Sequence, residues 1–158
     1  MGDARRNKIF AQFIKRNYPN SKTILVVADG LGELASCLMA EGYCVRVVEA
    51  KLRDRRKRAK GVDFIHGWFT RNDPIPEDLI IALHPDEATA EVVIAAQKNK
   101  KPFAIVPCCI LGTEAIGIKG FHEWIKKLIH LSGGECKITT LPIKGQNLVV
   151  FRKTEDIQ

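Results

Sequence analysis

The stretch KITTLPIKGQNLVVFRK, residues 137–153, decides the fold of this chain. It contains two runs, 137–145 and 147–153, that are rich in apolar and β-branched residues and are separated by a short Gly-Gln connection. Two such runs with no helical pattern between them predict an antiparallel β-hairpin. The rest of the chain has a different organisation, because helical patterns separate its apolar runs.

Upstream of the hairpin, five apolar runs alternate with amphipathic segments. A continuous apolar run is typical of a parallel strand that is buried on both faces. Strands that alternate with helices predict a doubly wound α/β sheet, here mostly parallel and finished by the C-terminal antiparallel hairpin. We expect strands at 23–29, 44–50, 62–69, 78–85 and 102–109, and helices at 5–18, 33–42, 86–100 and 121–134. Further expectations are a helix N-cap at Asp86, a helical start to 51–60 and a frayed tail at 154–158.

Length and composition predict one globular domain over 1–158. The chain has 158 residues, of which 46% are hydrophobic and 27% charged, and this excludes extensive disorder. No apolar run approaches the roughly 18–20 residues of a membrane span, and MGDARRNKIF lacks the apolar core of a secretory signal. Five cysteines without scaffold spacing indicate free thiols in a reducing compartment. We therefore expect a cytoplasmic protein, or a nuclear one.

The positive charge is concentrated in one segment. Basic residues exceed acidic ones by 25 to 18, a formal net charge of +7. The decapeptide KLRDRRKRAK, residues 51–60, holds seven basic residues and one acid, so it carries +6 of that total. A run this dense is compatible with a solvated surface, a nuclear localisation signal or a phosphate-binding surface. For a phosphate-rich substrate the candidate residues are Arg53, Arg55, Arg56, Lys57 and Arg58.

The first strand–helix junction carries a candidate nucleotide loop. In VVADGLGELA, the turn Asp29-Gly30-Leu31-Gly32 leads from a strand into a helix, where backbone N–H groups can approach a ligand. Glu49 ends the second strand, at the position where a carboxylate accepts both ribose hydroxyls of an adenosine. Trp68, after the third strand, is a candidate for stacking on adenine, although a large aromatic residue also fits a core. Without a full GxGxxG, the loop favours an adenosine over a dinucleotide.

The fourth and fifth strands end in residues that can do chemistry. His84 is a candidate general base near neutral pH, and Asp86 can orient it or accept the proton itself. Each also has a structural interpretation, as a strand end and as a helix cap. Cys108 and Cys109 follow the fifth strand and are candidates to line the same site. No metal site is expected, since adjacent cysteines have poor ligand spacing; Cys37, Cys44 and Cys136 are interpreted as buried inert thiols.

These features together resemble the class I S-adenosylmethionine (SAM)-dependent methyltransferases. The motifs HPDEAT, KPFAIVPCC and LPIKGQN are similar to those of small uncharacterised members, and more distantly to tRNA methyltransferases with a Cys-Cys motif. The resemblance covers most of 23–152. It implies SAM as cofactor, held by Asp29, Gly30, Gly32, Glu49 and Trp68, and RNA, above all tRNA, as substrate. Two of the family's loop residues are missing, with Val26 and Ala28 in their places.

Several alternatives remain open at this point. One is a catalytically inactive Rossmann-like module that binds RNA or a protein partner through 51–60. Another is a small-molecule or protein methyltransferase, for which the basic run is incidental. A third is a cysteine nucleophile, Cys108 or Cys109, of the kind found in RNA 5-methylpyrimidine methyltransferases.

Overall fold

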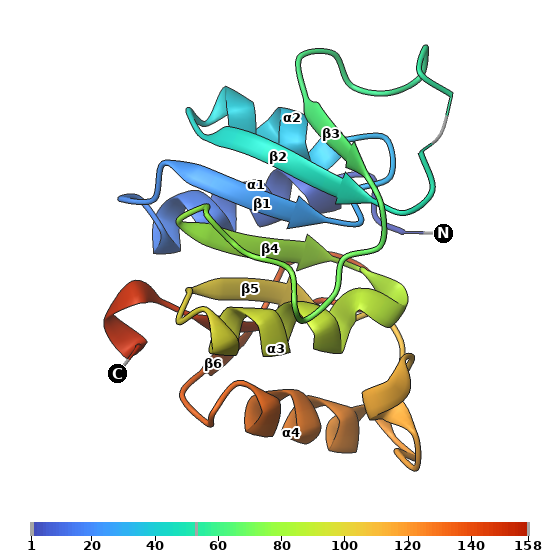
Figure 1. Cartoon of the computed structure of the whole chain (residues 1–158), viewed down its shortest axis with the longest axis vertical. Helices are drawn as coiled ribbons and strands as arrows, with labels where there is room; N and C mark the ends of the chain where they lie inside the picture. Colours follow the sequence, from blue (N-terminus) through green and yellow to red (C-terminus); the bar gives the residue numbers. More distant parts are fainter. Residues whose placement is uncertain (1, 53, 158) are drawn as a thin grey trace.

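Seven strands form one sheet in the order β3-β2-β1-β4-β5-β7-β6 (Figure 1). The computed structural model describes residues 2–52 and 54–157. Neighbouring strands from β3 across to β5 are parallel, whereas β7 is antiparallel to both β5 and β6. The strands are β1 (Thr23–Val27), β2 (Cys44–Glu49), β3 (Asp63–His66), β4 (Leu79–Leu83), β5 (Phe103–Val106), β6 (Lys137–Thr140) and β7 (Leu148–Arg152). The expected mixed sheet with a C-terminal antiparallel hairpin is therefore confirmed.

Four α-helices cover the two faces of the sheet (Figure 1). Alternate residues of one strand enter opposite cores: Ile24 and Val26 face the side of α1 and α2, while Leu25 and Val27 face the side of α3 and α4. This division explains why the strands read as continuous apolar runs. The helices are α1 (Arg6–Asn17), α2 (Glu33–Ala40), α3 (Thr89–Lys98) and α4 (Phe121–Leu131), and short 3-10 turns occupy Asp86–Ala88, Thr113–Ala115 and Thr154–Asp156.

Arg152 joins the last strand to the ends of two helices. Its side chain is buried, and its terminal nitrogens donate to the carbonyl oxygens of Ala96, Lys101 and Ser132 and to the Gln97 side chain. These acceptors lie at the carboxyl ends of α3 and α4, where a positive charge is favoured by the helix dipole. The guanidinium therefore fastens both helices to β7.

Three local expectations were wrong. In its described part, 51–52 and 54–60, the basic segment forms turns and no helix. The Asp54 carboxylate accepts the Arg56 backbone N–H, a local turn that competes with helix formation, and the dense like charge opposes helix formation as well. The tail turns at Thr154–Asp156, where Asp156 pairs with Lys137 at 3.3 Å, instead of fraying; Gln158 lies outside the described residues.

The third of these concerns Asp86. Its carboxylate makes no cap hydrogen bond to α3, because the chain enters that helix through a 3-10 turn.

Among the described residues, no helix has the length and apolar character needed to cross a membrane.

Candidate functional site

The loop after β1 is held in a conformation that exposes its backbone. Ala28, Gly30 and Gly32 all have positive φ, at 62°, 62° and 85°. The Asp29 carboxylate accepts the backbone N–H groups of Leu34 and Ala35, at 3.1 and 2.8 Å. Asp29 thus caps α2, and burial raises its pKa to about 7 despite these two bonds. The Asp29 carboxylate therefore stabilises the loop by joining it to the first turn of α2.

Gly32 is closely approached by Phe64 of β3 and by Ala59 at the end of the basic segment. A Cβ atom at this position would lie 2.7 Å from Cζ of Phe64 and 3.3 Å from Cβ of Ala59. The Ala59 N–H also donates to the Leu31 carbonyl at 2.8 Å. The end of the basic segment is therefore packed directly against the loop.

Glu49 ties the loop to the end of β2. One carboxylate oxygen accepts the Gly30 N–H at 2.7 Å, and the other accepts the Lys51 N–H at 3.1 Å. The side chain is buried, with 8% of its surface exposed. Because a carboxylate offers about four lone-pair sites, two remain for hydroxyl donors of a ligand.

Two cavities meet at Glu49 and share four residues. The larger, of about 500 Å³, lies between the loop after β1, the start of α1 and the end of β4. The smaller, of about 90 Å³, lies between the ends of β2, β3 and β4. Both are bordered by Ala28, Glu49, Lys51 and Asp86. They form one cleft along the carboxyl edge of the sheet, where ligands of open α/β sheets bind.

The smaller cavity has the character expected of a base-binding site. Its walls include Val27, Val48, Phe69 and Trp68, so that it is largely apolar. Trp68 is 61% exposed, which excludes the core interpretation considered for it. A flat heterocycle can enter here while the adjoining ribose meets Glu49.

The larger cavity carries charges of both signs. Arg6 and Glu33 line it, and Asn7, which also lines it, donates to a Glu33 carboxylate oxygen at 3.0 Å. Sequence reasoning missed Asn7 and assigned Glu33 no binding role. The signal that could have revealed Asn7 is its position at the start of α1, which is visible only once α1 is known to begin beside this cleft.

His84 lies at the margin of the larger cavity with one nitrogen already used. Its Nε2 is 2.9 Å from the Gln146 carbonyl oxygen. Because a carbonyl only accepts, Nε2 carries the proton in the neutral ring and Nδ1 keeps its lone pair. Burial lowers the pKa of His84 from its usual value. The neutral, base-competent form is therefore favoured at neutral pH.

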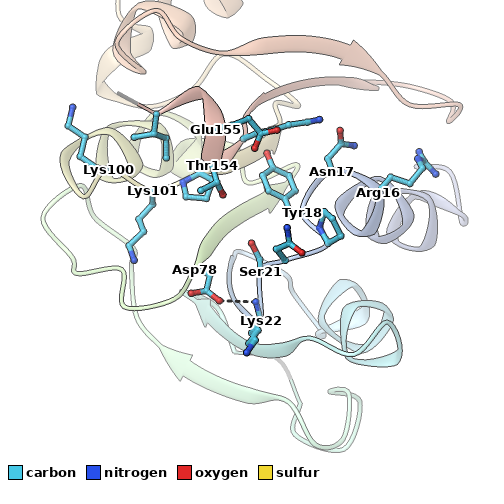
Figure 2. Close-up of a pocket in the computed structure, with 15 residues that line it drawn as sticks. Arg16, Asn17, Tyr18, Ser21, Lys22, Asp78, Lys100, Lys101, Thr154 and Glu155 are labelled. Carbon is cyan, nitrogen blue, oxygen red and sulfur yellow. Dashed lines mark hydrogen bonds between the residues drawn. The ribbon is translucent and has the colours of Figure 1, made fainter.

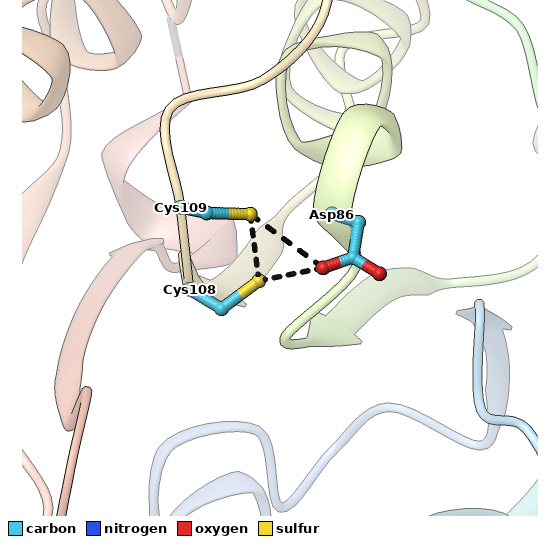
Figure 3. Close-up of side chains that lie close together, drawn as sticks. All are labelled: Asp86, Cys108 and Cys109. Carbon is cyan, nitrogen blue, oxygen red and sulfur yellow. Dashed lines mark hydrogen bonds between the residues drawn. The ribbon is translucent and has the colours of Figure 1, made fainter.

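Asp86 and the two adjacent cysteines form a cluster beside this cleft (Figure 3). The Cys108 and Cys109 sulfurs lie 3.1 and 3.5 Å from one Asp86 carboxylate oxygen and 3.3 Å from each other. Burial and the contact with Asp86 raise the pKa of Cys108 to about 12, and burial raises that of Cys109. This environment favours neutral thiols and gives no electrostatic support to a cysteine nucleophile.

Backbone strain is concentrated around the same cleft. Ala28, His84, Asp86 and Lys100 are the non-glycine residues with positive φ in the described part of the chain. Three of the four border the cleft, and such strain is typical of functional sites.

The basic segment lies in the wide loop that leads from the carboxyl end of β2 to the start of β3 (Figure 1). Lys51 borders both cavities, and Arg55, Arg56 and Lys57 are exposed. Arg58 differs from these, because its guanidinium lies 5.4 Å from the Phe64 ring and packs against β3. Arg53, also a candidate, lies outside the described residues.

The remaining cysteines do not join the cluster. Cys37 and Cys136 are half-buried, and Cys44 is exposed, so the expectation of a buried thiol is wrong for Cys44. Its side chain points outward because β2 begins at this residue at the edge of the core.

A cavity larger than either of the two that meet at Glu49 lies at the opposite edge of the sheet (Figure 2). It has a volume of about 880 Å³ and is bordered by the amino ends of strands, including Lys22, Asp78 and Pro102. Its lining is dominated by exposed or half-exposed polar chains, and it contains none of the loop or strand-end residues described above. We therefore assign the candidate site to the smaller cleft at the carboxyl edge.

Several solved structures of methyltransferases have a similar fold. A SAM-bound amino pentose methyltransferase of calicheamicin biosynthesis from Micromonospora echinaspora matches with TM-score 0.63 and 14% identity over 94% of this chain and 90% of that one. A sugar N-methyltransferase from Streptoalloteichus matches with TM-score 0.62 and 13% identity, over 95% and 87%. A putative SAM-dependent methyltransferase from Methanococcus maripaludis matches with TM-score 0.62 and 13% identity, over 95% and 85%.

Other matched structures are longer than this chain. The chain spans 49% of a Streptomyces venezuelae structure, 60% of an S-adenosylhomocysteine (SAH)-bound one and 64% of one from Anabaena variabilis. No protein-family model matches the chain, and no curated protein sequence matches it. At these identities the likeness shows the fold alone, which is that of the SAM-dependent methyltransferases.

Proposed function

We propose that this chain is a SAM-dependent methyltransferase and that its cofactor occupies the cleft at the carboxyl edge of the sheet. The observation that carries this proposal is the buried Glu49 carboxylate between an apolar cavity and a charged one. An adenosine needs an apolar slot for the base and an acceptor for the ribose hydroxyls, and the residues present fit both needs. SAM supplies an electrophilic methyl group when bound.

The larger cavity fits the methionine end of SAM. This end is a zwitterion, with one carboxylate and one ammonium group. Arg6 offers a cation for the carboxylate, and Glu33 offers an anion for the ammonium. A dinucleotide fits less well, since Glu33 begins α2 where a pyrophosphate would need the helix N-terminus.

His84 is the candidate base. Its Nε2 is fixed by the Gln146 carbonyl, so Nδ1 is the atom that can accept a proton from the acceptor group. Asp86 borders both cavities and is the candidate to orient the acceptor. Cys108 and Cys109 border neither cavity, and they contact the site only through Asp86, to which both thiols are hydrogen-bonded.

Ligand binding can be tested through the two tryptophans. Trp124 is fully buried in the core, whereas Trp68 is exposed and lines the apolar cavity. We expect SAH to change the fluorescence of Trp68 and leave Trp124 as an internal reference. Trp68→Ala should weaken SAH binding about 5- to 150-fold, the range for loss of one aromatic–base stack of about 1–3 kcal/mol.

The result that would overturn the cofactor proposal is equally direct. If calorimetry detects no SAH or SAM binding to the folded wild-type chain at millimolar ligand, the chain is an inactive module of this fold. If the affinity for SAH is instead unchanged in Trp68→Ala, the adenine base does not bind against Trp68 in the apolar cavity.

For the acceptor we propose RNA, with tRNA as the first candidate. The support is the position of the basic segment: it adjoins the cleft through Lys51 and is fastened to the loop through Ala59. Its exposed cations can contact phosphates on either side of a nucleotide whose reactive group enters the cleft. Sequence-specific contacts to bases are not implied by these residues.

The RNA proposal is tested by salt dependence with a matched control. One variant neutralises the exposed cations of the segment and spares Arg58, which packs on Phe64: Arg55→Gln, Arg56→Gln, Lys57→Gln and Lys60→Gln. The control removes the same charge at the opposite edge: Lys22→Gln, Lys100→Gln, Lys101→Gln and Lys153→Gln. Only the first variant should bind tRNA more weakly and reduce the slope of log K against log salt, by up to about 0.9 for each phosphate that is no longer neutralised.

Equal losses in both variants would show that net charge alone, and not this segment, attracts RNA. A small-molecule acceptor is the second candidate, favoured by the sugar substrates of two of the structural neighbours. It is distinguished by methyl transfer that is unaffected by either set of substitutions.

A further inference from the structure

The cluster of Asp86, Cys108 and Cys109 has the composition of a metal site, a role separate from the orientation of the acceptor that the proposed function gives to Asp86. We propose that these three residues bind one zinc ion at the rim of the cleft, through two sulfurs and one carboxylate oxygen. The fourth position of the ion is left for water or for a donor atom of the substrate. This inference does not depend on SAM binding.

The distances between the donor atoms match one face of a tetrahedral zinc site. Zinc–sulfur bonds of about 2.3 Å and zinc–oxygen bonds of about 2.0–2.2 Å give edges of about 3.8 Å between two sulfurs and about 3.5 Å between sulfur and oxygen. Here the corresponding distances are 3.3 Å between the sulfurs and 3.1 and 3.5 Å from the sulfurs to the Asp86 oxygen. An ion would need the three atoms to separate by only a few tenths of an ångström.

Adjacent cysteines are usually poor partners for one ion, because successive side chains of an extended strand point to opposite faces. That reasoning fails here for a local cause. β5 ends at Val106, and Pro107 directs the chain out of the sheet, so Cys108 and Cys109 lie in irregular backbone. Both sulfurs then turn toward the same carboxylate (Figure 3).

The carboxylate is delivered by the neighbouring strand. β4 and β5 are adjacent and parallel, so their carboxyl ends meet at one edge of the sheet. Asp86 follows β4 with a positive φ of 52°, a conformation that is unfavourable for an aspartate unless its surroundings hold it there. The strained turn therefore fixes an acidic oxygen opposite the two thiols.

The donor set identifies the class of ion. Two thiolate sulfurs favour borderline or soft ions, such as zinc and Cu(I), over magnesium or calcium. The oxygen ligand shifts the preference from Cu(I) to zinc. Three protein ligands with an open fourth position are the arrangement of catalytic rather than structural zinc sites. Asp86 borders both cavities, so an ion at this cluster would lie beside the bound substrates.

The experiment uses the whole chain, stripped of metal with a chelator, kept reduced and titrated with zinc chloride against a chromophoric competitor. We expect one zinc per chain. Cys108→Ala and Cys109→Ala should each weaken binding more than about 100-fold, beyond the 10- to 100-fold cost of losing an outer-shell partner. Cys44→Ala is the matched control, because it removes an exposed thiol far from the cluster, and should bind zinc like the wild type.

A second measurement keeps the test valid if either cluster variant fails to fold. In the wild type, zinc should slow alkylation of Cys108 and Cys109 and leave Cys44 unprotected, as read by mass spectrometry of peptides. The proposal is overturned if the reduced wild type binds no zinc, if it binds Cu(I) but not zinc, or if zinc protects Cys44 equally.

Discussion

Replacement of Glu49 by glutamine should weaken both the fold and the ligand site. The two side chains have nearly the same size, but an amide has one acceptor oxygen and one donor NH2 group. Glu49 now accepts one N–H on each oxygen, from Gly30 and from Lys51. In Glu49→Gln one of these N–H groups faces another donor and loses its partner. A buried group left unsatisfied costs about 1–3 kcal/mol, so the free energy of unfolding should fall by that amount.

The same change removes one of the two charged acceptors for the ribose hydroxyls. A hydrogen bond to a charged group is worth about 1.5–3 kcal/mol, which corresponds to an increase of about 10- to 150-fold in the Kd for SAH. Calorimetric titration measures the change in the Kd for SAH, and urea unfolding measures the change in the free energy of unfolding. Glu135→Gln is the control, because it removes the same charge from an exposed site. If Glu49→Gln binds SAH within twofold of the wild type, Glu49 does not contact the ribose.

Three further changes have expected outcomes. His84→Gln should reduce the rate of methyl transfer about 10²- to 10⁴-fold, because it removes the candidate base. In the wild type, burial lowers the His84 pKa, so kcat/KM should decrease with decreasing pH only below about 6.5. Below that pH His84 binds a proton more readily in the unfolded chain than in the folded one. The free energy of unfolding of the wild type should therefore fall relative to that of His84→Gln, and the same pH dependence of this free energy in both proteins would contradict the prediction. Gly32→Ala should cost about 1–3 kcal/mol in urea unfolding, since φ is 85° and Cβ would lie 2.7 Å from Phe64, and an unchanged midpoint would mean that Phe64 moves freely. Arg152→Met should cost about 3–5 kcal/mol by leaving its buried acceptors unpaired, and a loss below about 1 kcal/mol would show that water replaces the guanidinium.

The sheet could be predicted from the sequence because its signals are local and redundant. The central parallel strands β1, β4 and β5 are almost entirely apolar and buried, and the hairpin of β6 and β7 lacks an intervening helix. The strand ends were less accurate: β1 stops at Val27, two residues before the expected end, because Ala28 already has a left-handed conformation. Left-handed alanine has no sequence signature, unlike left-handed glycine.

Of the two aspartates that border the cleft, Asp29 caps a helix and Asp86 does not. Asp29 was a candidate for cofactor binding, and Asp86 was a candidate catalytic residue that could also cap a helix. In the structure the Asp29 carboxylate caps α2, and the Asp86 carboxylate faces two thiols instead of α3. Both lie just before a helix, so their sequence contexts are similar. What distinguishes them is the backbone: the positive φ of Asp86 turns its side chain away from the helix that follows.

The interior position of the last strand has a consequence for the synthesis of this protein. Within the described residues β7 lies between β5 and β6. The β5 edge, with all four of its residues buried in the finished sheet, therefore lacks this partner until β7 has been made. At the other end of the chain, the Tyr18 hydroxyl lies 2.7 Å from the Phe103 carbonyl and 3.0 Å from the Arg152 carbonyl. A nascent chain on the ribosome therefore keeps an apolar, unpaired strand edge until residues 148–152 have been synthesised. Premature termination shortly before 148 should yield an aggregation-prone product, not a smaller folded domain.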